Sequence, residues 1–104
     1  MSIVERVSDK SVPVVVVLEE FAHEAVLRCD ALLCPEETGF SIVCVNLRGV
    51  ISQGETEAEA IENIQDAFRE TVRYYRDANE QIPWGDVEIE RTPGSRMKYL
   101  AVRI

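Results

Sequence analysis

The fold is decided by residues 39–83, which read GFSIVCVNLRGVISQGETEAEAIENIQDAFRETVRYYRDANEQIP. This stretch predicts a strand over Phe40–Asn46, a turn at Asn46-Leu47-Arg48-Gly49 and a short strand over Val50–Gln53. A long amphipathic helix follows directly after Gly54. The block therefore predicts antiparallel strands that are covered by a single helix.

The start of the helix is marked by Thr56-Glu57-Ala58-Glu59, which has the spacing of a capping box. In this motif the Thr56 side chain accepts a hydrogen bond from a free backbone N–H, and Glu59 reaches back to the Thr56 N–H. The large apolar residues then recur at steps of three and four, which places them on one stripe. They are Ile61, Ile64, Phe68, Val72 and Tyr75. Asn79 and Pro83 mark the helix end, and the stripe must pack against a sheet.

Further strands are predicted on both sides of this block. Val26–Cys34 alternates, so Leu27, Cys29, Ala31 and Leu33 share one face, while Arg28 and Asp30 are expected to face solvent. Lys98–Ile104 predicts a closing strand, and Val87–Ile89 predicts a weak one.

Together these elements predict an α+β fold in the order β-β-β-α-β. A three-stranded antiparallel sheet and a further strand carry one long amphipathic helix on one face, with a β-rich extension at the N-terminus. The chain is predicted to be a single domain over 1–104, with an extension at 1–22, a core at 24–83 and a C-terminal strand region at 86–104. Gly39, Gly49, Gly54, Thr56 and Glu59 form its structural motif.

The extension contains Val12–Leu18, a β-branched run that cannot stay exposed to water. We expect it to be covered by a second subunit, in a homodimer or homotetramer. The interface candidates are Val14, Val15, Val16, Val17 and Leu18. The alternative is that the run joins its own sheet.

Composition limits the classes of partner. The 104 residues carry a formal net charge of −8, which argues against binding of the protein by itself to the phosphate backbone of nucleic acids and favours a basic partner. The sequence has no apolar run long enough to span a membrane, and its first residues lack the pattern of a signal peptide, so a cytoplasmic location is expected. Cys29, Cys34 and Cys44 match no zinc motif and are expected to be small buried residues, with metal binding the lesser alternative.

The central block resembles the HicB family of antitoxin-like proteins. The matching residues are Gly39-Phe40, Asn46-Leu47-Arg48-Gly49, Ser52-Gln53-Gly54-Glu55-Thr56, Glu59-Ala60-Ile61-Glu62-Asn63 and Ile82-Pro83. The resemblance implies a partial ribonuclease-H-like fold and the binding and neutralisation of a small basic HicA-like toxin that degrades mRNA. Nothing after Pro83 looks like the DNA-binding segment of longer members, so a short stand-alone member is implied.

No reaction chemistry is visible in the sequence. Asp30 is the single carboxylate within the three central strands, and one ligand cannot hold two metal ions. His23 is the one histidine, and we interpret it as a surface or interface residue. We therefore predict no enzyme, no catalytic or metal-binding residues and no cofactor. The alternative to an antitoxin is an orphan domain that self-associates or binds a small ligand without a toxin partner.

Overall fold

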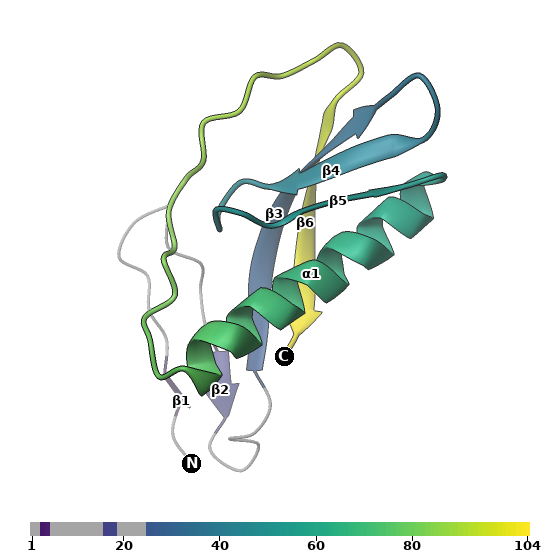
Figure 1. Ribbon diagram of the computed structural model, residues 1–104. Coiled ribbons are helices and arrows are strands. Elements are labelled where there is room, and N and C mark those ends of the chain that lie inside the picture. The colour runs from purple at the N-terminus through teal and green to yellow at the C-terminus, as the bar shows by residue number, and fades with distance from the viewer. Residues whose placement is uncertain (1–2, 5–15, 19–24) are drawn as a thin grey trace.

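The computed structural model describes residues 3–4, 16–18 and 25–104 (Figure 1). Over these ranges the chain forms one helix and six strands in a single sheet. The elements are β1 Ile3–Val4, β2 Val16–Leu18, β3 Ala25–Pro35, β4 Phe40–Cys44, β5 Ile51–Gly54, α1 Glu57–Asp77 and β6 Arg96–Arg103. From β3 onward their order confirms the predicted α+β fold.

The long strand β3 lies at the centre of the sheet. It pairs antiparallel with β4 over Ala31–Pro35 and with β6 over Val26–Leu33. Residues 31–33 pair with both strands, so β4 and β6 lie on opposite edges of β3. Because β5 pairs with β4, the main part of the sheet has the spatial order β6-β3-β4-β5. The short strand β2 pairs with the beginning of β3, beyond the end of β4.

Residues 78–95 carry the chain from the end of α1 back to the opposite end of the sheet (Figure 1). The last strand, β6, therefore runs antiparallel to β3. The prediction of a weak strand at Val87–Ile89 is wrong. The Val87 N–H donates to the Val45 carbonyl at 2.7 Å, and an isolated bridge joins Trp84 to Leu47, but these bonds do not extend into a ladder.

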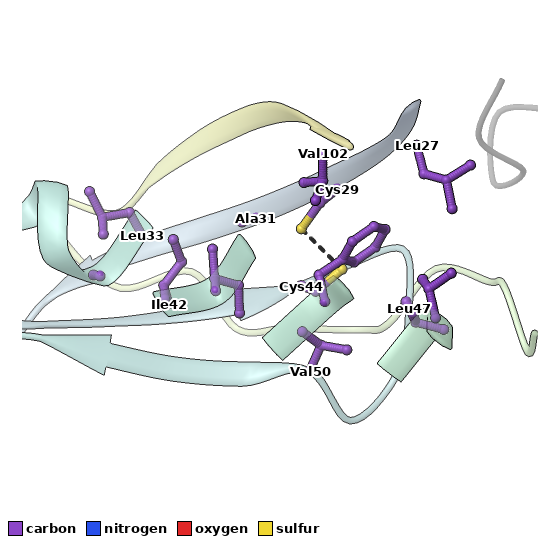
Figure 2. Close-up of a cluster of buried hydrophobic side chains, with 13 residues drawn as sticks. Leu27, Cys29, Ala31, Leu33, Ile42, Cys44, Leu47, Val50 and Val102 are labelled. Atoms are coloured by element: carbon purple, nitrogen blue, oxygen red, sulfur yellow. Dashed lines mark hydrogen bonds between the residues drawn. The ribbon is translucent and has the colours of Figure 1, made fainter. Parts of the chain in front are cut away.

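The apolar stripe of α1 forms the core with one face of the sheet, as predicted. Its buried residues are Ala60, Ile64, Phe68 and Val72. They cluster with alternate residues of β3 and with residues of β4 and β6, such as Ile42 and Val102 (Figure 2). Phe68 is fully buried, and its ring centroid lies 6.0 Å from that of Trp84. Packing of this face therefore stabilises the helix on the sheet.

Both helix ends lie where the sequence predicts them. Thr56 is the N-cap, and its hydroxyl accepts from the Glu59 N–H at 3.1 Å. The Glu59 carboxylate accepts from the N–H of Glu55 at 2.7 Å, one residue before the N–H that the capping box predicts. At the other end Asn79 has a φ of 58°, the left-handed conformation that ends many helices.

Two glycines allow close backbone contacts at the start of the helix. A Cβ on Gly54 would lie 2.4 Å from the Ala60 nitrogen, and one on Gly39 would lie 2.6 Å from the Gly54 carbonyl oxygen. Gly39 and Gly49 also have φ values of 82° and 90°, which favour glycine. The hairpin turn, β5 and the first turn of α1 are thereby brought together.

Asn46 takes over the pairing of β3 where β4 ends. Its side-chain Nδ2 donates to the Arg28 carbonyl and its Oδ1 accepts from the Asp30 N–H, both at 2.9 Å. The Val45 N–H donates to the Asp30 carbonyl at 2.7 Å. Asn46 is 1% exposed, so these hydrogen bonds are buried. They replace the backbone bonds that β4 would make to β3 if it continued past Cys44.

The face of β3 that points away from α1 is more buried than the alternation of apolar and polar residues in its sequence predicts. Asp30 and Leu32 are 8% and 1% exposed, although neither belongs to the core under α1. The expectation that Asp30 faces solvent is therefore wrong. Two observations indicate that residues 78–95 approach this region. Asp86 acts electrostatically on Asp30, and Gly94 lies against the Pro35 ring.

We expect Phe68→Ala to lower the free energy of unfolding by about 3–5 kcal/mol, because it leaves a cavity between the helix and the sheet. Urea denaturation measures this change. Tyr74→Ala is the control on the same helix, since Tyr74 is 63% exposed, and should change stability by about 0.5 kcal/mol or less. A loss below about 1 kcal/mol for Phe68→Ala would mean that the stripe is not the core.

We expect Asn46→Ala to cost about 2–4 kcal/mol, because it leaves the Arg28 carbonyl and the Asp30 N–H without partners. The same denaturation experiment measures the cost. Arg48→Ala, at an exposed position in the same turn, is the matched control. Equal stabilities for the two variants would show that water replaces the Asn46 amide.

Candidate functional site

A concave acidic surface lies at the start of α1. Here the turn between β3 and β4, the end of β5 and the first two turns of the helix surround a groove of about 530 Å³. Its lining residues are Glu36, Thr38, Gly39, Phe40, Ser41, Gln53, Gly54, Glu55, Glu59 and Asn63. We call this surface the acidic groove.

The acidic groove contains three carboxylates and no basic side chain among its lining residues. Glu36, Glu55 and Glu59 belong to exposed residues, so their charges remain available to a partner in solution. Glu36 accepts a hydrogen bond of 2.7 Å from the Ser41 hydroxyl, which orients this carboxylate on the wall of the groove. The groove therefore presents three negative charges, of which Glu36 and Glu59 are oriented by hydrogen bonds.

Hydrogen bonds and glycines hold the shape of the groove. The Asn63 side chain donates to the Gln53 carbonyl at 2.8 Å, which ties the helix to β5. Gly39 and Gly54 keep side chains out of the space where the hairpin, β5 and α1 meet. Gly39 and Gly54 belong to the structural motif that the sequence predicts, whereas Asn63 lies beyond it.

Glu57 adjoins the groove but does not add to its free charge. The Lys98 ammonium lies 3.0 Å from its carboxylate, and the Arg96 guanidinium contacts it as well. Hydrogen bonds from Lys98 and Arg96 lower the pKa of Glu57. This pairing joins the start of α1 to β6 and leaves the excess of negative charge to the groove itself.

A second polar cluster lies on the face of β3 away from the helix. The Arg28 Nε is 3.0 Å from the Asp30 carboxylate. Burial raises the pKa of Asp30, the Arg28 guanidinium opposes this effect, and the Asp86 carboxylate adds to it. Among the described residues no three His, Cys, Asp or Glu side chains gather to hold a metal ion.

A smaller cavity of about 370 Å³ lies where residues 78–95 leave the helix. Its lining residues are Arg48, Tyr75, Pro83, Trp84, Gly85 and Asp86. Tyr75 was predicted to belong to the helix stripe, whereas the roles of Trp84 and Asp86 were not foreseen. Their neighbours come from distant parts of the chain, and no local pattern in the sequence indicates this cavity.

The structure places the predicted interface residues only in part. Val14, Val15 and the lone His23 lie outside the described residues. Val16–Leu18 form β2, which pairs antiparallel with β1 and β3. The backbone of Val16–Leu18 thus joins the chain's own sheet, and the subunit interface stays a prediction. No helix within the described ranges is long and apolar enough to cross a membrane.

The comparisons with known proteins give no relative for this chain. No protein-family model, curated protein or solved structure matches it.

We expect the raised pKa of Asp30 to be visible in the pH dependence of stability. A folded-state pKa above the unfolded value means that the ionised carboxylate destabilises the fold. As the pH falls from neutral to about 4, the wild type should therefore gain free energy of unfolding relative to Asp30→Asn. Urea denaturation across this pH range measures the difference.

Asp86→Asn is the control for this prediction. It removes the neighbouring charge that raises the pKa of Asp30, so it should shrink the gain without abolishing it. Parallel pH profiles for the wild type and Asp30→Asn would contradict the buried, destabilised carboxylate.

Proposed function

We propose that this chain is a HicB-like antitoxin-type module, which binds and neutralises a small basic toxin that degrades mRNA. The observation that carries the proposal is the acidic groove, with its three carboxylates and no basic lining residue. Lysine and arginine side chains of a toxin would complement this charge, and the −8 net charge would accelerate the encounter.

The resemblance of residues 39–83 to the HicB family supports the same class of partner. The entry to the helix, which carries the most specific part of the resemblance, also contributes Gly54, Glu55 and Glu59 to the lining of the acidic groove. The module would act in the cytoplasm, would not bind nucleic acid by itself, and would assemble as a homodimer or homotetramer. No catalytic step is part of this proposal.

The experiment is co-expression with the product of the adjacent reading frame, which this proposal expects to be a small basic HicA-like toxin. Toxin alone should arrest growth, and co-expression of this chain should restore it. The double variant Glu36→Lys/Glu55→Lys should lose the rescue and weaken the complex at least ten-fold, because two charges of the groove are reversed. Titration calorimetry on the purified proteins measures the affinity.

The matched control is Glu88→Lys/Glu90→Lys, which makes the same change of net charge at exposed positions outside the groove. This variant should keep the rescue and most of the affinity. Equal losses in both double variants would mean that net charge, rather than the groove, attracts the toxin. A chain that neither binds nor neutralises the toxin would contradict the antitoxin proposal.

A second candidate function is the binding of a small ligand by an orphan, self-associating domain. The cavity lined by Tyr75 and Trp84 favours it, because two aromatic rings lie beside one basic and one acidic side chain. This candidate requires no protein partner.

A further inference from the structure

Two cysteines face each other inside the core and have no place in the proposed function. Cys29 on β3 and Cys44 at the end of β4 are both 0% exposed, and their sulfur atoms lie 3.7 Å apart (Figure 2). Cys44 pairs across the strands with Ala31, so the two cysteines are diagonal neighbours whose side chains point toward one another. Both thiols are free.

The surroundings make the two thiols unequal. Cys29 donates its S–H to Cys44, and this bond, together with burial, raises the pKa of Cys29. The same bond lowers the pKa of Cys44, and the backbone N–H groups of Asn46 and Leu47 act in the same direction, against the effect of burial. The Cys44 S–H donates in turn to the Asn46 Oδ1 at 3.0 Å, so the two sulfurs and the amide form one hydrogen-bonded chain. Of the two thiols Cys44 is therefore the more acidic, and its proton is held by the Asn46 Oδ1.

We propose that Cys29 and Cys44 form a site of reversible oxidation by hydrogen peroxide, in which Cys44 reacts first and Cys29 resolves the product into an intramolecular disulfide. In the first step the Cys44 sulfur attacks one peroxide oxygen and the O–O bond breaks. Cys44 becomes a sulfenic acid, and one water molecule leaves.

In the second step the Cys29 sulfur attacks the sulfenic sulfur of Cys44. The S–O bond breaks, a second water molecule leaves, and the S–S bond forms, so two thiols have been oxidised and one peroxide has been reduced. The sulfur atoms must approach from 3.7 Å to about 2.05 Å. The product would fasten β4 to β3 covalently, beside the point where Asn46 takes over the pairing.

Cys34 offers an internal comparison. It lies near the other end of β3, is half-buried and has no partner thiol at its side among the described residues. In the wild type it reports that peroxide reaches the protein. Replacing it by serine removes the one competing thiol without touching the pair.

The test treats folded wild type and Cys34→Ser with hydrogen peroxide and then alkylates the remaining thiols in denaturant. We expect most Cys34→Ser molecules to lose the mass of two hydrogen atoms and to take up no alkylating reagent. Cleavage after Glu36 and Glu37 separates Cys29 from Cys44 in the sequence, so a linked peptide pair identifies the bond. Dithiothreitol should restore both thiols.

Cys29→Ser assigns the roles of the two sulfurs. In this variant Cys44 should stop at the sulfenic acid, which dimedone captures, whereas Cys29 in Cys44→Ser should react at least ten-fold more slowly. If Cys34→Ser keeps two alkylatable thiols under conditions that oxidise Cys34 in the wild type, the proposal is overturned. A disulfide that involves Cys34, or one that forms only after addition of urea, would overturn it as well. These outcomes need only the wild type and Cys34→Ser, so they hold even if the other variants fail to fold.

Discussion

The buried amide of Asn46 is the interaction on which the rest of the structure depends. It satisfies β3 at the Arg28 carbonyl and the Asp30 N–H, where β4 has already turned away. Without it, the central strand would carry unpaired backbone groups in its buried middle section, at a cost comparable to a large core substitution. With it, β4 can leave the sheet early, Leu47 and Val50 can enter the core, and residues 84–87 can lie along the turn.

The fold was predictable because its main signals are local. The Thr56 cap, the 3–4 spacing of the apolar stripe and the stop at Asn79 each depend on neighbours within a few residues, and the helix follows from them. Pairing of β6 with β3, by contrast, joins residues more than sixty positions apart. The sequence predicts that both are strands, but alternation alone does not reveal which edge each strand occupies.

The same distinction between local signals and long-range contacts explains why the candidate sites were not predicted. The glycines and glutamates of the acidic groove lie within residues 36–59, where the sequence indicates only turns and a helix cap, because the groove appears only when the hairpin meets the helix. Asp30 was misplaced because alternation assumes that one sheet face is open to water, and here residues 78–95 approach that face. The contact between the Cys29 and Cys44 sulfurs likewise depends on a diagonal approach across strands.

The route of residues 78–95 has a consequence for how the protein is made. The central strand β3 is synthesised early, but one of its long edges stays open until Arg96–Arg103, more than sixty residues further along, have been added. Until then the helix and the β3-β4-β5 hairpins lack the strand that pairs with this edge. Pairing of β6 with β3 then joins residues that are more than sixty positions apart in the sequence. Completion of the sheet is therefore the slow, non-local part of folding.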